Sequence, residues 1–304
     1  MFVWLGKIVL ALLTVFVLTA CAIFIRFLFW RGEIEHDLSE NSIVITTVNG
    51  PVEYAEKGRG RPVLMIHGTP GGYDQGLSYV DAAGLSNSGL RYIVPSRPGY
   101  LRTPLSSGRT PEQQARLYAA LLSRMGITRV AVLGASGGAP SALQFAMLFP
   151  ERCSALILEE AVTQRILPER KPEASTLQDF LTYLFGDKLI SSWQAKDPGD
   201  PAISRIGEGI INSTLPSASR LPGQLNDMEQ FSRIDNWPLN RIHCPTLILH
   251  GTADENVPIA HAEFAHAQIP SSALIRLLGA DHYMVATKYR ELNQLIDAFI
   301  ARHQ

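Results

Sequence analysis

The chain has 304 residues, enough for one large domain or for a domain with an insertion. Its formal net charge is -1 and its acidic and basic residues are interspersed, so the sequence offers no basic face for nucleic acid. The three cysteines, Cys21, Cys153 and Cys244, cannot form a disulfide framework, and no C-x-x-C pair or H-E-x-x-H motif predicts a metal site. We therefore expect neither a metal nor a cofactor.

The first predicted element is an apolar helix near the N-terminus. Residues 8–25 carry no charge, and at about 1.5 Å per helical residue they extend about 27 Å, close to the thickness of a bilayer core. Arg26 and Arg31 follow, with aromatic residues between them, which is typical of a membrane interface. We interpret residues 1–31 as a single transmembrane anchor, expected in a bacterial inner membrane, and residues 32–42 as a polar linker.

Two other interpretations of this segment stay open. One is an ordinary cleaved signal peptide, and the other is a lipoprotein signal, because the residues ending at Cys21 resemble a lipobox. Apolar residues continue past Cys21 to Trp30, whereas a mature N-terminus normally turns polar. The side of the membrane also stays open, because Lys7 and the amino terminus balance the two arginines that follow the helix.

From residue 43 onward, strand-like and helix-like stretches alternate, which predicts a mostly parallel, doubly wound α/β sheet. The first two strands form a predicted hairpin with Asn49-Gly50 as its turn. Thr110 and Gln113 form a capping box at the start of a helix. We expect strands at residues 43–48, 52–56, 62–66, 92–94, 130–133, 155–158, 246–250 and 274–277.

The alternation stops between residues 161 and 236. Apolar residues at three- and four-residue spacing from Leu177 to Leu189 predict an amphipathic helix, and further helix-like stretches follow. We interpret residues 161–236 as a helical lid over the active edge of the sheet, with residues 43–160 and 237–304 forming the core. A structural helical subdomain remote from the site is the alternative.

A glycine-rich turn, G-A-S-G-G at residues 134–138, follows the predicted strand 130–133. A strand that turns at once into a helix forces its central residue, Ser136, into a strained conformation that only small neighbours tolerate. The turn exposes the serine oxygen. It also places the N–H of Gly137 at a helix N-terminus, where it can stabilise an oxyanion. An ordinary glycine-rich turn is the other interpretation of this pattern.

A serine hydroxyl needs a base and a carboxylate to become a nucleophile at neutral pH. Asp254 follows the predicted strand 246–250, and His282 follows the predicted strand 274–277. Because parallel strands end at one edge of the sheet, both residues are expected beside Ser136. We therefore predict Ser136, Asp254 and His282 to be the catalytic residues.

Three further motifs are HGTPGG at residues 67–72, SRPGY at residues 96–100 and HGTADENVP at residues 250–258. With them, the chain resembles α/β-hydrolase-fold serine hydrolases of the bacterial lid-bearing type over residues 43–303. The order Ser, Asp, His is that of the family, whereas Ser96 stands where an Asp is more usual. The resemblance implies that the backbone N–H groups of Thr69 and Gly137 bind the oxyanion.

Other carboxylates compete for the role of the acid. Asp281 and Glu255 adjoin the predicted residues in the sequence. Glu159 and Glu160 end an earlier strand, where some members of the family carry their acid. All four are considered less suitable than Asp254.

Two residues of these motifs are expected to be structural. His67 is expected to brace its loop rather than to act as a base. Arg97 is expected to form an ion pair that braces loops, and a substrate carboxylate is its other possible partner. Neither is included among the predicted catalytic residues.

The serine nucleophile indicates acyl transfer, because members of this fold that displace a halide or open an epoxide carry an aspartate at that position. We expect a carboxylic ester hydrolase that acts on a small-molecule acyl substrate through an acyl-enzyme. The alternatives are proline iminopeptidase-like activity, to which the HGTPGG loop is similar, and carbon–carbon bond hydrolysis on the same residues. A non-catalytic, membrane-tethered binding protein also stays open.

Overall fold

A single mixed sheet forms the centre of the protein. The computed structural model describes residues 2–82, 85, 89–167 and 171–303. Eight strands lie in the order β1-β2-β4-β3-β5-β6-β7-β8; β1, β2 and β4 pair antiparallel and the other neighbours pair parallel. The expected fold class is confirmed. The strands are β1 (Ile43–Thr47), β2 (Gly50–Gly58), β3 (Arg61–Ile66), β4 (Leu90–Pro95), β5 (Val130–Ala135), β6 (Cys153–Glu159), β7 (Thr246–Gly251) and β8 (Ser272–Leu277).

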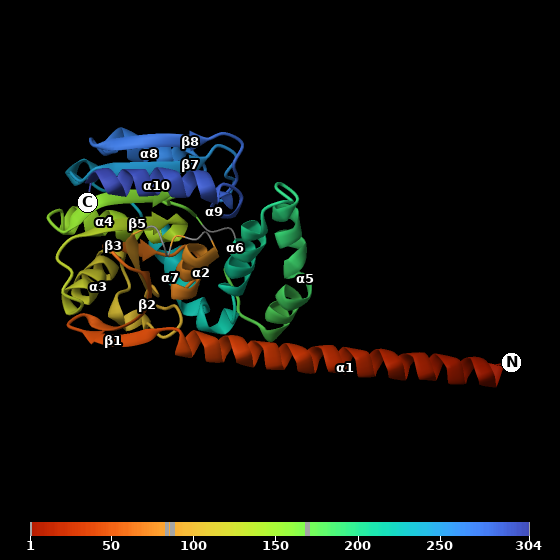
Figure 1. The fold of residues 1–304 in the computed structure, drawn as a ribbon. Coiled ribbons are helices and arrows are strands. Elements are labelled where there is room, and N and C mark those ends of the chain that lie inside the picture. The colour runs from red at the N-terminus through yellow and green to blue at the C-terminus, as the bar shows by residue number, and fades with distance from the viewer. Residues whose placement is uncertain (1, 83–84, 86–88, 168–170, 304) are drawn as a thin grey trace.

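Helices cover both faces of this sheet (Figure 1). Alternate residues of β3 point to opposite sides, so that Met65 packs in the core beneath α2 and α10, whereas Ile66 packs in the core beneath α3, α4 and α8. Burial on both faces explains why the central strands are continuous apolar runs. The described helices that surround the sheet are α2 (Tyr73–Ala82), α3 (Pro111–Arg124), α4 (Ala139–Leu148), α8 (Ala260–Gln268), α9 (Met284–Thr287) and α10 (Tyr289–His303).

Local sequence signals set two of the element ends. The Thr110 side chain accepts the backbone N–H of Gln113, and the Gln113 side chain accepts the backbone N–H of Thr110, so the predicted capping box is confirmed at the start of α3. The first hairpin differs from the prediction, because its turn is Val48-Asn49 and Thr47 pairs with Gly50. The Thr47 hydroxyl accepts the N–H of Asn49 and donates to the carbonyl of Gly50, which closes the turn one residue early.

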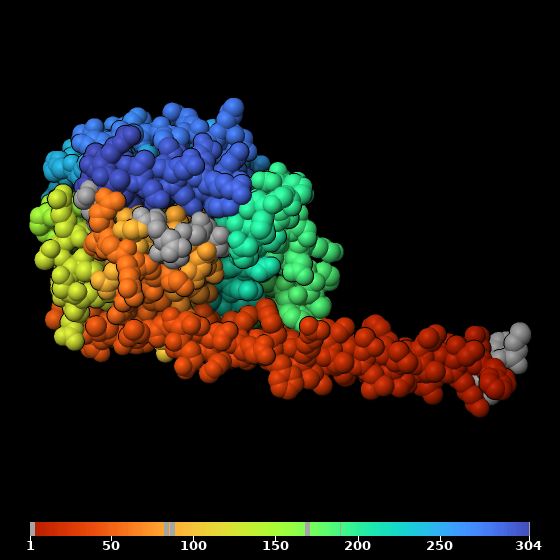
Figure 2. Space-filling view, in the orientation of Figure 1, coloured from red at the N-terminus to blue at the C-terminus, as the bar shows by residue number. Residues whose placement is uncertain are grey.

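The predicted polar linker at residues 32–42 is helical over most of its length. Helix α1 (Phe2–Glu40) continues through it almost to the first strand. Arg31 and Glu35 form an ion pair one turn apart, and Leu38 packs against the core, so this polar stretch is the half-exposed end of a long helix. Figure 2 shows the N-terminal part of α1 projecting away from the body of the protein.

The length and composition of α1 are those of a membrane span. By these criteria, one helical stretch in the described part of the chain, Trp4–Glu40, is apolar and long enough to cross a bilayer. Its most apolar window is not buried inside the protein.

Three α-helices lie in the described part of the chain between β6 and β7, where the sequence predicts helical structure. These helices, called the insertion below, stand beside α2 at one side of the sheet (Figure 1). They are α5 (Thr176–Gln194), α6 (Pro201–Asn212) and α7 (Leu221–Phe231).

Candidate active site

The turn after β5 holds Ser136 in a strained backbone conformation. Its φ is +47°, a value that residues with a Cβ rarely adopt. The turn needs small neighbours, because a Cβ at Gly134 would lie 2.6 Å from the Ala142 side chain and a Cβ at Gly138 would lie 2.4 Å from the carbonyl oxygen of Ile66. The sequence G-A-S-G-G is therefore required by close backbone packing between β5, β3 and α4.

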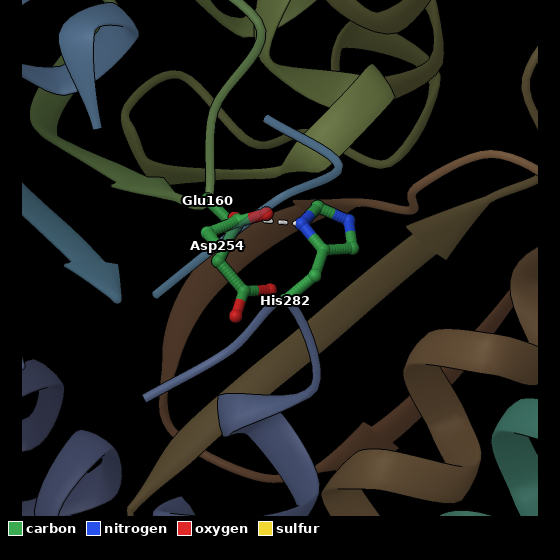
Figure 3. Close-up of side chains that lie close together, drawn as sticks. All are labelled: Glu160, Asp254 and His282. Atoms are coloured by element: carbon green, nitrogen blue, oxygen red, sulfur yellow. Dashed lines mark hydrogen bonds and ion pairs between the residues drawn. The ribbon is translucent and has the colours of Figure 1, made fainter. Parts of the chain in front are cut away.

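Three side chains from separate loops form a continuous hydrogen-bonded chain at this edge of the sheet. Ser136 Oγ lies 3.1 Å from His282 Nε2, and His282 Nδ1 lies 2.8 Å from Asp254 Oδ2. Figure 3 shows the His282–Asp254 contact. With the proton on Nδ1 shared with Asp254, Nε2 is free to accept the proton of Ser136. The structure thus brings together the three residues that were predicted to be catalytic.

The environment of Asp254 keeps it ionised. Its other oxygen, Oδ1, accepts the backbone N–H groups of Asn256 and Val257, both at 2.9 Å. Burial by itself raises the pKa of Asp254, but the hydrogen bond and the charge of His282 outweigh burial and lower the pKa below its ordinary value. A carboxylate that stays charged can hold the imidazole in one tautomer and stabilise the imidazolium.

Two of the competing carboxylates, Asp281 and Glu160, have other partners. Asp281 forms an ion pair with Lys196 at 2.9 Å and accepts the backbone N–H of Tyr283. Glu160 accepts the backbone N–H of Met284 at 3.2 Å. Hydrogen bonding therefore selects Asp254 as the partner of His282.

Glu160, Asp254 and His282 also form a group of possible metal ligands. One ligand atom of each lies within 4.8 Å of the others. Both ring nitrogens of His282 and the facing oxygen of Asp254 already take part in the hydrogen-bonded chain described above. These side chains are therefore better suited to transferring a proton than to binding a metal ion.

The loop after β3 lies against the serine turn. A Cβ at Gly137 would lie 2.2 Å from the Thr69 hydroxyl oxygen, so the two predicted oxyanion donors are close neighbours. Within the described part of the chain, the Thr69 N–H has no hydrogen-bond acceptor. The Gln75 side chain accepts the N–H of Gly68 and donates to the carbonyl of Pro70, which fixes the loop on both sides of Thr69.

His67 braces the same loop, as expected. Its Nε2 accepts the backbone N–H of Arg97 at 2.9 Å, so its proton lies on Nδ1, which donates to the carbonyl of Gly68 at 2.8 Å. Burial, followed by the charge of Arg97, lowers the pKa of His67 well below its ordinary value. His67 is thus a neutral structural residue.

Arg97 forms the ion pair that the sequence analysis expected, and its partner is Asp227 on α7. Both side chains are buried, and Nη1 of Arg97 lies 2.7 Å from Asp227 Oδ1. Asp227 also accepts the hydroxyl groups of Thr69 and Tyr100. Burial disfavours the charged form of Arg97, but Asp227 outweighs it and raises the pKa of Arg97. This network ties α7 of the insertion to the loop that carries Thr69.

A cavity of about 370 Å³ lies against Ser136 and His282. Its wall is mainly apolar and takes side chains from the core, from α6 and from α7, among them Met65, Ile206 and Phe231. The described lining residues include no lysine and no arginine. The acidic residues of the wall are Glu159 and Glu160, at the end of β6.

Glu159 is an unpaired carboxylate in this wall. It is 1% exposed, and among the described residues neither of its oxygens has a hydrogen-bond partner. Burial raises the pKa of Glu159 to about 7. Burial, followed by the charge of Glu159, also raises the pKa of Glu160 well above its ordinary value. The pocket therefore carries up to two weakly acidic groups beside the hydrogen-bonded chain.

Sequence reasoning missed three residues of this site. Asp227 was not recognised as the partner of Arg97, and Gln75 was not recognised as the brace of the Thr69 loop. Glu159 was considered only as a rival acid and not as part of the pocket wall. For Asp227, an acidic residue in a helical stretch gives no local signal, because its role depends on where α7 docks.

Comparison with known proteins supports the same fold. The sequence matches the family described as alpha/beta hydrolase fold over residues 61–289. The chain belongs to the alpha/beta hydrolase fold family. A structure of an alpha/beta hydrolase fold protein from Nakamurella multipartita is similar to it with a TM-score of 0.79 and 34% identity, over 85% of this chain and 98% of that one.

Two curated relatives are also hydrolases by name. An uncharacterized hydrolase, YcgS, from Bacillus subtilis (strain 168) is 29% identical over 78% of this chain and 90% of the relative. A 2-hydroxy-6-oxo-6-phenylhexa-2,4-dienoate hydrolase from Comamonas testosteroni is 26% identical over 82% of this chain and 91% of the relative. The chain is thus a hydrolase of this family.

Proposed function

We propose that this hydrolase cleaves a carboxylic ester through an acyl-enzyme formed on Ser136. The observation that carries the proposal is the chain of hydrogen bonds from Ser136 Oγ through His282 to Asp254. It provides the three functions that an alcohol nucleophile requires: the nucleophile itself, a base within reach, and a carboxylate that orients the base.

The geometry supports the following reaction. Ser136 Oγ attacks the ester carbonyl carbon while His282 Nε2 accepts its proton. The backbone N–H groups of Thr69 and Gly137 stabilise the negative oxygen of the tetrahedral intermediate. The imidazolium then gives its proton to the leaving alcohol, and the acyl group stays on Ser136. A water molecule, deprotonated by His282, releases the carboxylic acid and restores the serine.

Carbon–carbon bond hydrolysis, the alternative from the sequence, stays the second candidate, and the Comamonas relative is named as a hydrolase of a 2-hydroxy-6-oxo-6-phenylhexa-2,4-dienoate. The substrate in that name is a dienoate, which is an anion. The described wall of this pocket has no lysine and no arginine, so it offers no permanent positive charge to a carboxylate and favours a neutral ester. Arg97 does not contribute a positive charge, because Asp227 neutralises it.

A kinetic comparison tests this proposal. The full chain in detergent is given 4-nitrophenyl esters of increasing acyl length and, separately, a 2-hydroxy-6-oxo-dienoate. We expect turnover of the esters, no measurable cleavage of the dienoate, and complete loss of ester turnover in Ser136→Ala. Ser123→Ala, on α3 and remote from the pocket, is the matched control and should keep wild-type activity. Dienoate cleavage faster than ester cleavage would favour the second candidate.

We also propose that α1 anchors the enzyme in a membrane. The support is an uncharged stretch of eighteen residues, from Ile8 to Ile25, whose side chains are exposed along the helix. The aromatic residues and arginines that follow it suit the boundary between lipid and water.

A further inference from the structure

Helix α5 presents an exposed apolar face on the outside of the protein. Its inner side packs on α6, where Trp193 lies against Gly207. Its outer side carries four large apolar side chains at helical spacing, which are between 39% and 66% exposed: Leu177, Leu181, Leu184 and Phe185. A helix that faces water carries polar residues on its outer side, so a contiguous apolar row indicates a partner.

The start of α5 is joined to α1 where that helix leaves the body. The Phe27 ring of α1 is buried, and its centroid lies 5.2 Å from that of Phe180 on α5. The rings of Trp30 and Tyr183 are 4.8 Å apart. Arg31 of α1 also lies 3.7 Å from the buried Asp179. The two helices therefore have a defined relative position.

The length of α1 beyond this junction matches the thickness of a bilayer. The uncharged residues from Ile8 to Ile25 extend about 27 Å at about 1.5 Å per residue, against about 30 Å for a hydrocarbon core. If this stretch fills the core, Arg26 and Phe27 lie at the boundary between lipid and water. Phe27 is also the residue that contacts α5. The first turns of α5 are therefore at the depth of the membrane surface.

The direction of α5 is suited to this depth. Figure 1 shows α1 running away from the body past α5, and α5 running across the direction of α1 on the side from which α1 projects. Transmembrane helices are tilted by about 20° from the membrane normal on average. A helix that runs across the direction of α1 therefore lies near the plane of the membrane surface. A positive charge lies next to the apolar row, because Lys188 Nζ is 5.0 Å from the Phe185 ring centroid. A lysine at this place can reach anionic lipid headgroups.

We propose that α5 lies on the bilayer surface, with Leu177, Leu181, Leu184 and Phe185 inserted among the lipid chains, and that the enzyme takes an apolar ester dissolved in that bilayer. The inference rests on the proposed ester hydrolysis and on the proposed anchoring by α1. It names the lipid surface as the partner of the exposed face of α5.

The contacts of α6 connect this face to the pocket. α6 lies between α5 and the cavity, and its residues Ile206 and Ile210 line the cavity wall. Leu167, which directly follows the wall residue Ile166, is 72% exposed. Lipid contact along α5 thus keeps the cavity, which α6 separates from α5, near a bilayer in which an ester of low water solubility is concentrated.

A depth measurement tests the position of α5 without reference to activity. The full chain, with Cys21→Ser and Leu181→Cys, is labelled with nitrobenzoxadiazole and reconstituted into vesicles of phosphatidylcholine and phosphatidylglycerol. We expect lipids that carry a nitroxide near the headgroup to quench this label. The same label on Val48→Cys, at a 94% exposed turn position in the β1–β2 hairpin, should stay unquenched. Equal quenching at both positions would overturn the proposal.

An activity measurement tests the substrate class. The variant Leu177→Ser/Leu181→Ser/Leu184→Ser should lose at least tenfold in turnover of a long-chain ester dissolved in the vesicles, and should keep turnover of water-soluble 4-nitrophenyl acetate within twofold. The control Val44→Ser/Val48→Ser/Leu278→Ser, which changes exposed apolar residues away from α5, should match wild type on both esters. Equal turnover of the vesicle ester by both variants would overturn the inference. Failure of wild type on both esters would instead overturn the proposed ester hydrolysis.

Discussion

At the scale of single residues, the carboxylates near His282 differ in what they contact. Asp254 bonds to His282 Nδ1, whereas Glu160 bonds to the backbone N–H of Met284. Replacing Asp254 by Asn keeps the shape but places a hydrogen-bond donor toward the imidazole, which favours the wrong tautomer. We expect Asp254→Asn to lower kcat for a 4-nitrophenyl ester by about 10⁴-fold.

The matched control is Glu160→Gln, which keeps an acceptor for the N–H of Met284. It should lower kcat by no more than about tenfold, because Glu160 has no bond to the imidazole. If Glu160→Gln were the more damaging change, Glu160 and not Asp254 would be the acid.

A second prediction at this scale concerns pH and Glu159. Because burial raises the pKa of Glu159 to about 7, the folded state binds more protons than the unfolded state between the ordinary carboxyl pKa and 7. Its contribution to the free energy of unfolding is therefore present at low pH and is lost as the pH rises through this window. The rise of the pKa of Glu159 to about 7 corresponds to about 3 kcal/mol.

Chemical denaturation of the full chain in detergent at pH 5 and pH 8 measures this effect. In Glu159→Gln, the loss of stability between the two pH values should be smaller than in wild type by up to about 3 kcal/mol. Glu151→Gln, at an exposed position, should leave the loss unchanged. An identical loss in Glu159→Gln and wild type would show that Glu159 does not titrate in this range.

The residues that the sequence predicted are those with local signals. Ser136, Asp254 and His282 each lie just beyond a strand, and their small or turn-forming neighbours mark the position. The unpaired state of Glu159 has no such signal, because it depends on which side chains from α2 and from the loops after β8 surround the end of β6. No pattern within β6 distinguishes a paired from an unpaired carboxylate.

At the scale of elements, one buried ion pair connects the insertion to the loop of Thr69. In Asp227→Asn, Arg97 stays buried without its charged partner, and we expect the free energy of unfolding to fall by about 3–5 kcal/mol. Activity should fall too, because Asp227 accepts the Thr69 hydroxyl next to the proposed oxyanion donor. Unfolding by denaturant and ester kinetics on the same sample measure both effects.

Helix α7 provides a matched control. Glu229 pairs with Arg109 at 3.2 Å, but both side chains are substantially exposed, so Glu229→Gln should cost less than about 1 kcal/mol. The double variant Arg97→Met/Asp227→Leu should recover much of the stability that Asp227→Asn loses, because it removes the unpaired charge. Similar losses in Asp227→Asn and Glu229→Gln would contradict the buried network.

Elements were predicted from the sequence where periodicity or a cap marks them. The strands, the capping box of α3 and the helical character of the insertion are of this kind. The helical state of the end of α1 was not predicted from the sequence, because residues 32–40 are polar. A polar stretch after an apolar helix has the same composition as a linker. Its helical state follows from the packing of Leu38 on the core, which is a tertiary contact.

At the scale of the whole molecule, α1 is expected to remain part of the mature protein. Its apolar stretch continues beyond the possible lipobox to Trp30, whereas a mature N-terminus normally turns polar. Intact-mass spectrometry of the protein isolated from membranes should therefore find the unprocessed chain. A shortened chain that begins at a lipid-modified Cys21 would contradict the anchor and support a lipoprotein.

The central claim is that Ser136 is the nucleophile of an acyl-transfer enzyme. The most direct test is to treat the full chain with a fluorophosphonate and to locate the adduct by peptide mass spectrometry. We predict one adduct, on Ser136, which blocks ester turnover and is absent from Ser136→Ala. An adduct on another residue would contradict the claim and identify a different nucleophile. A folded protein that forms no adduct would also contradict it and would favour a binding protein that uses the pocket without chemistry.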